Sequence, residues 1–181
     1  MKRHTLIGCF AGVLSMSTWS HAQAVPTASR LGGKVALGVG GTLINPDFGQ
    51  TKIKAVTFFA DVDLVYSFGV EGEIHYSVIT PSDVSENSYL VGPRYIVRKK
   101  RVELYAKGLL GVGHFGLQAG SNANPATATY FEYALGGGID IRVSHHFNIR
   151  AIDFEAQKWP GFPTNGLSPY GGTVGVSYVF H

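Results

Sequence analysis

Residues 170–180 read YGGTVGVSYVF, a stretch in which large apolar residues alternate with small or polar ones. In a β-strand, successive side chains point to opposite faces of the sheet. Large apolar side chains therefore share one face, namely those of Tyr170, Val174, Val176, Tyr178 and Phe180. The pattern predicts a strand with one apolar face and one face of small residues.

Similar alternation recurs along the sequence and predicts eight strands. Their lengths bracket the roughly 9–11 residues that a tilted membrane-spanning strand needs. The expected strands cover residues 34–43, 53–66, 70–79, 89–97, 102–115, 131–143, 147–157 and 169–180. Together, residues 25–181 have the length of one domain.

The connections between these strands alternate in length. Short turns are expected at 67–69, 98–101 and 144–146, and longer loops at 45–47, 81–83, 121–125 and 160–166. Outer-membrane barrels have short periplasmic turns and longer extracellular loops. The sequence therefore predicts an all-β fold, an eight-stranded antiparallel up-and-down transmembrane β-barrel.

The two faces of the strands differ in composition. Which face points outward indicates whether the barrel lies in a membrane or in water. The charged faces are rich in Gly and Ala, which suits the crowded interior of an eight-stranded barrel. A membrane barrel carries aromatic girdles on its outer surface. Aromatic residues lie near strand ends on the apolar faces, at Tyr66, Tyr89, Tyr95, Phe131, Phe147 and Phe180. We predict that the apolar faces point outward; a soluble, secreted, lipocalin-like barrel would require the opposite assignment.

The inward faces hold charged residues that we expect to form a salt-bridge network plugging the lumen. An enclosed ion must be paired and hydrogen-bonded, because burying it alone costs several kcal/mol. Acids outnumber bases in this set, so some acids are expected to be hydrated or to share protons. The predicted interior network consists of Asp61, Asp63, Glu71, Glu73, Arg94, Glu103, Lys107, Glu132, Asp140, Arg142, Arg150, Asp153 and Glu155.

The strand at 147–157 breaks the regular alternation. Arg150 occupies an even position, whereas Asp153 and Glu155 occupy odd ones, so a regular strand would separate them. A single β-bulge near residues 151–152 would place all three inside. The alternative is an irregular edge strand; we favour the bulge.

The first 24 residues have the pattern of a cleaved signal peptide. Lys2 and Arg3 precede a short apolar segment at 6–16, and AQA at 22–24 provides a small-residue cleavage site. The apolar segment is too short to span a bilayer as a helix. LIGC at 6–9 resembles a lipoprotein processing site, although almost no apolar region precedes it. We expect cleavage after Ala24, followed by export.

Cleavage would remove most of the net charge and the single cysteine. The full chain has 15 Lys and Arg against 12 Asp and Glu, and loss of Lys2 and Arg3 leaves 13 against 12. A nearly neutral mature chain gives no argument for nucleic-acid binding. Without Cys9, disulfide and thiol chemistry are not expected.

Several motifs could carry chemistry, but each has a simpler structural explanation. His75-Tyr-Ser77 has a spacing seen in hydrolases, including barrels that trim lipid A, yet it lies on the inner face, away from lipid. Paired interior carboxylates could do acid–base work. His145-His146 could bind a metal, but adjacent residues on a short turn diverge. We therefore predict no catalytic, cofactor or metal site and expect that the protein is not an enzyme.

Two further motifs bear on contacts. The turn at 98–101, Arg-Lys-Lys-Arg, is expected to be solvated, although it could touch an acidic partner or anionic lipid. The segment Trp-Pro-Gly-Phe-Pro at 159–163 is expected to pack locally within its loop, with an exposed contact patch as the alternative.

The ending GVSYVF at 175–180 resembles that of OmpA/OmpX-like small outer-membrane barrels of the porin family. Segments 92–95, 135–140 and 157–159 are similar to internal strands of the same family. The resemblance implies an eight-stranded barrel inserted by the outer-membrane assembly machinery, which reads the terminal strand. It assigns the assembly signal to Tyr178 and Phe180; His181 departs from the family, in which the aromatic residue is normally last.

These inferences converge on a structural or interaction protein of the cell envelope, in the outer membrane of a Gram-negative bacterium. The expected partners are outer-membrane lipids and the assembly machinery, and the long loops could meet an extracellular ligand. No cofactor is expected. The alternative function is a narrow pore that passes water, ions or small solutes.

Overall fold

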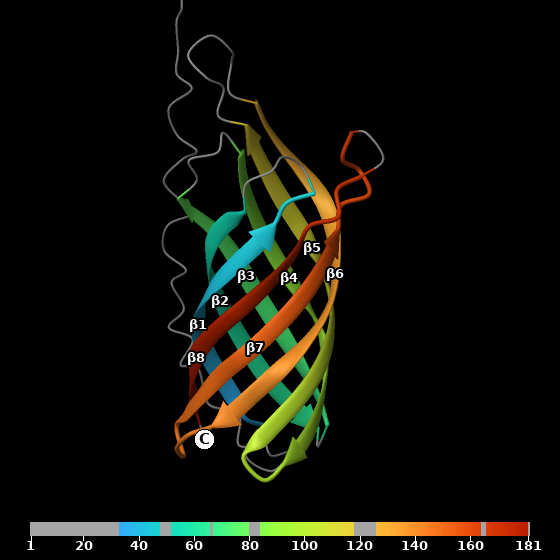
Figure 1. Cartoon of the computed structure of the whole chain (residues 1–181). Coiled ribbons are helices and arrows are strands. Elements are labelled where there is room, and N and C mark those ends of the chain that lie inside the picture. Colours follow the sequence, from blue (N-terminus) through green and yellow to red (C-terminus); the bar gives the residue numbers. More distant parts are fainter. Residues whose placement is uncertain are drawn as a thin grey trace, which may run out of the picture.

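The computed structural model describes residues 33–47, 52–65, 67–79, 84–117, 126–163 and 166–180. The expected signal peptide, Tyr66 and His181 lie outside these residues. The described chain forms eight strands (Figure 1): β1 (Val35–Asn45), β2 (Ile53–Val65), β3 (Phe68–Ile79), β4 (Val84–Lys99), β5 (Val102–Leu117), β6 (Ala126–Arg142), β7 (Phe147–Lys158) and β8 (Tyr170–Phe180). Among the described residues, no helix is long and apolar enough to cross a membrane.

The strands close into a barrel. Each strand pairs antiparallel with the next along the chain, and β1 pairs with β8, with Val35 opposite Phe180 and Asn45 opposite Tyr170. Joining both edges of the sheet lets the backbone groups pair within the barrel, which a hydrocarbon environment requires. The predicted eight-stranded antiparallel fold is confirmed.

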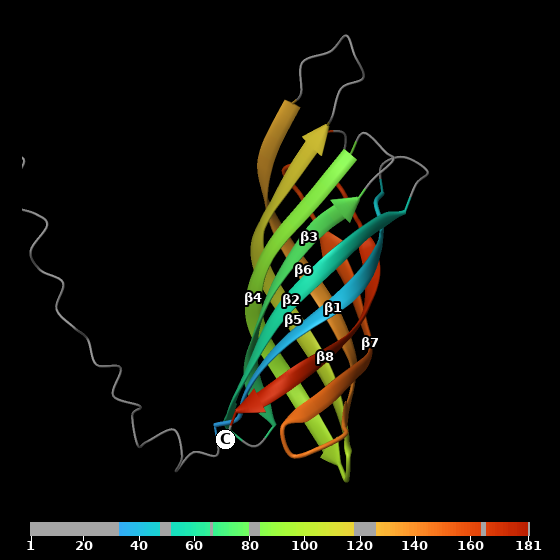
Figure 2. The same ribbon diagram turned by 90° about the vertical axis from the view of Figure 1, so that its left-hand side faces the viewer.

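The two ends of the barrel differ, as Figures 1 and 2 show. The C-terminus lies at the end where β2–β3, β4–β5 and β6–β7 connect, which we call the short-turn end. The other end, the long-loop end, carries the remaining connections. The β3–β4 connection is shorter than expected, because β4 begins at Val84 rather than at residue 89. The polar composition of residues 85–88 resembles that of a loop and conceals this part of the strand.

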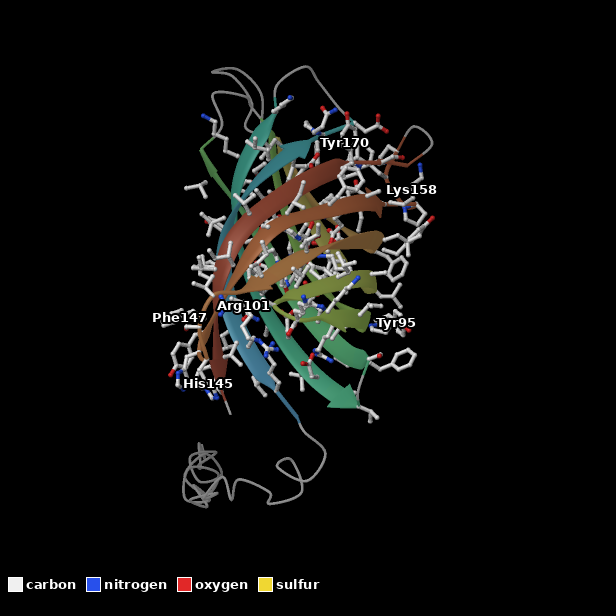
Figure 3. All side chains as sticks on the ribbon, turned by 60° about the horizontal axis from the view of Figure 1, so that its bottom comes forward. Tyr95, Arg101, His145, Phe147, Lys158 and Tyr170 are labelled. Carbon is white, nitrogen blue, oxygen red and sulfur yellow. The ribbon has the colours of Figure 1, made fainter. Side chains whose placement is uncertain are left out.

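The apolar faces point outward. Leu135, Leu110 and Phe68 are 66%, 58% and 60% exposed, whereas Glu71 and Glu132 on the opposite faces are fully buried. Figure 3 shows side chains filling the interior, with Tyr95 and Phe147 on the outside. The outward assignment is confirmed, and the lipocalin-like arrangement is wrong for this chain.

A β-bulge in β7 corrects the phase of the strand. Ile139 pairs with Ile152 and Asp140 pairs with Arg150, which leaves Ala151 as the extra residue. Arg150 and Asp153 are consequently both buried in the lumen. The predicted bulge is confirmed.

Inner-face glycines make room for large aromatic side chains on the adjacent strands. A Cβ added to Gly38 would lie 2.2 Å from the ring of Phe59, and one added to Gly138 would lie 2.6 Å from the hydroxyl of Tyr105. Gly38 pairs with Phe59 and Gly138 pairs with Tyr105, so each glycine leaves space for the ring of its cross-strand partner. Both rings go on to contact the interior charges described below.

We predict that Gly38→Ala lowers the free energy of unfolding by about 1–3 kcal/mol, because the new methyl group overlaps the Phe59 ring. Urea titration of the folded protein in detergent measures the loss. Gly41→Ala is the matched control, since its Cβ would meet nothing within 4 Å. Equal stability of the two variants would contradict the tight fit at Phe59.

Candidate functional site

The centre of the lumen is occupied by the guanidinium of Arg150, which is 1% exposed. The bulge in β7 lets this side chain and Asp153 point inward together, and acids on four strands surround the guanidinium. Its nitrogens contact Glu71 at 2.8 Å, Glu73 at 3.0 Å, Asp61 at 3.1 Å, Asp153 at 3.1 Å and Asp140 at 3.4 Å. One cation therefore links β2, β3, β6 and β7.

Two further buried cations extend this arrangement. Arg94 of β4 contacts Asp61 and Asp140 at 2.5 Å each. Lys107 of β5 has its Nζ 2.7 Å from Glu73, 2.8 Å from Asp153 and 3.2 Å from Glu155. We call the set the central network; it comprises Arg94, Lys107, Arg150, Asp61, Glu71, Glu73, Asp140, Asp153 and Glu155.

An aromatic ring lies against the guanidinium group of each arginine in the central network. Arg94 lies 3.7 Å from the centre of the Tyr105 ring, and Arg150 lies 3.6 Å from the centre of the Phe59 ring. The Tyr105 hydroxyl also donates a hydrogen bond of 2.7 Å to Asp153. Cation–π contacts gain strength in desolvated surroundings such as these. The predicted set contains only charged residues and misses both rings, although their inner-face positions in the alternation could have identified them.

A second group of charges lies at the short-turn end. Glu103 contacts Arg142 at 2.9 Å, Lys34 at 3.1 Å and Arg98 at 3.5 Å, and Arg98 also pairs with Asp63. Arg142 is partly exposed, so this group forms a rim rather than a buried core. The turn is shorter than expected, because β4 continues to Lys99; Arg98 therefore lies in the strand, where its exposed side chain pairs with these acids.

A layer of threonines and His75 lies beside the central network, toward the long-loop end. The hydroxyls of Thr42, Thr57 and Thr173 are hydrogen-bonded in a row, and the Thr57 hydroxyl lies 2.8 Å from Nδ1 of His75. Nε2 of the same ring lies 3.4 Å from Glu73 and 3.5 Å from Glu155.

The His75-x-Ser77 motif does not form a joined pair of catalytic groups. The Ser77 hydroxyl donates a hydrogen bond of 2.5 Å to the backbone carbonyl of Glu86, whereas His75 contacts Thr57 and two carboxylates. A nucleophile and its base need to lie within hydrogen-bond reach of each other. These contacts give the motif a structural explanation.

An apolar cluster covers the lumen at the long-loop end. Trp159, Phe115 and Leu167 are buried together, with Tyr130 and Phe162 packed against them. The segment at 159–163 thus packs into its own barrel, in agreement with the local-packing interpretation. Gly113 provides the space, since a Cβ there would lie 2.4 Å from the Trp159 ring.

Glu132 lies beneath this cluster and outside the salt-bridge network. The Ser88 hydroxyl donates a hydrogen bond of 3.1 Å to the Glu132 carboxylate. Among the described residues, no cation forms an ion pair with Glu132. The assignment of Glu132 to the paired network therefore needs correction: its carboxylate lies near Gly113, as does the Trp159 ring, and it accepts a hydrogen bond from a neutral hydroxyl. Glu86, also buried, lies at the same end.

Charge is unbalanced within the central network. Its six carboxylates face three fixed cations, Arg94, Lys107 and Arg150. Small cavities remain beside it, one near Asp61 and Glu103 and another near His75 and Thr173, each of about 10 Å³ of space for the centre of a water molecule. That is room for about one water apiece. Protonation, hydration or binding of a further cation would therefore stabilise the excess negative charge of the central network.

The sequence matches the outer membrane protein beta-barrel domain family over residues 9–180. The chain belongs to this family. The resemblance to small outer-membrane barrels is therefore confirmed, and the bacterial outer membrane is the location that the family indicates. Comparison with curated protein sequences gives no match.

Solved structures of similar shape include Neisserial surface protein A, with a TM-score of 0.64 and 14% identity over 82% of this chain and 97% of that one. Ail, the attachment invasion locus protein of Yersinia pestis, gives a TM-score of 0.57 at 17% identity, covering 82% of this chain and 99% of that one. The N-terminal barrel of Pseudomonas aeruginosa OprF gives 0.56 at 13% identity, with coverage of 82% and 99%. At these identities the likeness shows a shared fold.

We predict that Arg150→Ala lowers the free energy of unfolding by about 3–5 kcal/mol, because it leaves buried carboxylates without their main partner. Urea unfolding followed by tryptophan fluorescence measures the change. Arg101→Ala, on the exposed turn between β4 and β5, serves as the control for loss of an arginine. A loss at Arg150 no larger than that at Arg101 would show that the central network does not stabilise the barrel.

Proposed function

We propose that this protein is a structural and interaction barrel of the outer membrane, with a lumen plugged by charge. The observation that carries the proposal is the Arg150 guanidinium, held by five carboxylates from four strands across the middle of the barrel. With Arg94 and Lys107, it ties together every strand from β2 to β7. A conduction path would have to pass through these contacts.

The energetics of buried ions support a permanent plug. Removing one partner of a buried pair is strongly destabilising, because the other charge is left without compensation. Arg150 and Lys107 each contact several carboxylates, so displacing either would leave several groups unpaired at once. The apolar cluster around Trp159 adds a second barrier at the long-loop end.

With the lumen filled, contact with other molecules is left to the outer surface and the connections. The outward apolar faces would meet lipid, and the long loops would present the surface for an extracellular ligand. We propose no enzymatic role. Export would begin with the signal peptide at residues 1–24, and the remaining chain from residue 25 would form the barrel domain.

We predict that the folded protein gives no discrete conductance steps in planar bilayers over a range of salt concentrations. Trp159→Ala should remain silent as well, because the central network lies below the apolar cluster and stays intact. Reproducible unitary steps from the wild-type protein would favour the alternative, a narrow pore. Steps from Trp159→Ala alone would place the barrier in the apolar cluster.

Assembly would depend on the closing strand. The Phe180 ring points outward and packs edge-to-face on Tyr178, with centroids 4.9 Å apart. We predict that Phe180→Ala, produced in a Gram-negative host, reduces several-fold the heat-modifiable protein in the outer-membrane fraction. Val176→Ala, which removes outward apolar surface from the same strand, is the matched control. Similar yields from both variants would contradict an assembly signal at Phe180.

A further inference from the structure

We propose that the lumen contains a binding site for a divalent zinc-class metal ion, formed by Glu73, His75 and Glu155. The site goes beyond the plug function, and it can exist whether or not the barrel conducts. Glu73 and His75 lie on β3, and Glu155 approaches from β7. One ligand atom from each residue lies within 4.8 Å of the others.

His75 has an imidazole nitrogen directed at the two carboxylates. Its Nε2 lies 3.4 Å from Oε2 of Glu73 and 3.5 Å from Oε1 of Glu155, without a well-aligned hydrogen bond to either. The side chain is only 4% exposed, so bulk water does not satisfy the nitrogen. Two ligand atoms each about 2.1 Å from a tetrahedral zinc ion are about 3.4 Å apart. The two distances at Nε2 match this separation.

The opposite nitrogen of the ring has a partner that favours metal binding. Nδ1 lies 2.8 Å from the Thr57 hydroxyl, which is in turn bonded to the Thr42 hydroxyl. If Nδ1–H donates to Thr57, Nε2 presents its lone pair to the carboxylates. Outer groups that hold a ligating imidazole in this way fix its tautomer and orientation.

A lone pair facing two carboxylates is repulsive unless a proton or a metal ion lies between them. The excess of carboxylates over cations in the central network makes a further positive charge favourable here. Lys107 does not occupy the position: its Nζ contacts Oε1 of Glu73 and Oε2 of Glu155, and thus leaves Glu73 Oε2 and Glu155 Oε1 on the side of His75. Gln157 donates a hydrogen bond of 2.9 Å to Oε1 of Glu155 and orients that carboxylate.

The donor set selects the class of metal. One imidazole and two carboxylates suit Zn²⁺, whereas Ca²⁺ and Mg²⁺ prefer oxygen ligands alone. The small cavity lined by His75, Glu155, Gln157 and Thr173 adjoins the site. It has room for about one water molecule, which would supply the fourth ligand.

The test uses tag-free barrel folded in detergent and titrated with Zn²⁺ by calorimetry, with the metal content measured after desalting. We expect one zinc ion per chain and visible absorption bands of a tetrahedral site when Co²⁺ replaces Zn²⁺. His75→Gln should weaken binding at least about tenfold. Thr57→Val keeps all three ligands but removes the partner of Nδ1, and should also weaken binding by about tenfold or more.

A double variant, His145→Ala with His146→Ala, controls for chelation by the exposed histidines of the β6–β7 turn, and it should bind as tightly as wild type. The proposal is overturned if this double variant loses the metal, or if His75→Gln retains wild-type affinity. It is also overturned if folded wild type, verified by its heat-modifiable mobility, takes up no zinc; His75 would then act as a protonated partner of the two carboxylates.

Discussion

The burial of Arg150 is the constraint on which the rest of this barrel depends. A guanidinium cannot be left unpaired in a narrow lumen, so acids must converge on it from the surrounding strands. Asp61, Glu71 and Asp140 do so from three different strands. The strand register must therefore place these residues at the same level along the barrel axis. The salt-bridge network and the closed hydrogen-bonded sheet thus require the same register.

The aromatic residues that pack around the charges also help to accommodate the buried guanidinium groups. Phe59 and Tyr105 cover the guanidinium faces, where a hydrogen bond cannot form, while the carboxylates take the edges. The rings fit because Gly38 and Gly138, their partners on the adjacent strands, lack a Cβ. The glycine content of the inner faces thus has a specific use: it lets an eight-stranded barrel enclose aromatic rings together with ions.

The alternation of the sequence predicts the number of strands, their faces and a bulge near residues 151–152, because a period of two residues follows from backbone geometry alone. It does not predict that β4 and β6 each begin five residues early, at Val84 and Ala126. The partners of each charge were less accessible. Arg98 reaches Asp63 and Glu103, whereas Glu132 meets only the Ser88 hydroxyl among the described residues. Such pairings depend on the relative height of residues on different strands and on side-chain length, and neither quantity appears in a single strand's pattern.

The surplus of carboxylates over cations gives the lumen a negative electrostatic potential, and this potential has a consequence beyond filling the lumen. Three fixed cations would balance three acids, whereas the central network holds six, and two of these, Glu73 and Glu155, also face His75. A network that only needed to fill space could have used uncharged groups at these positions with less desolvation cost. Retaining acids beside an imidazole keeps a local negative potential in the lumen, where a proton or a metal ion is stabilised.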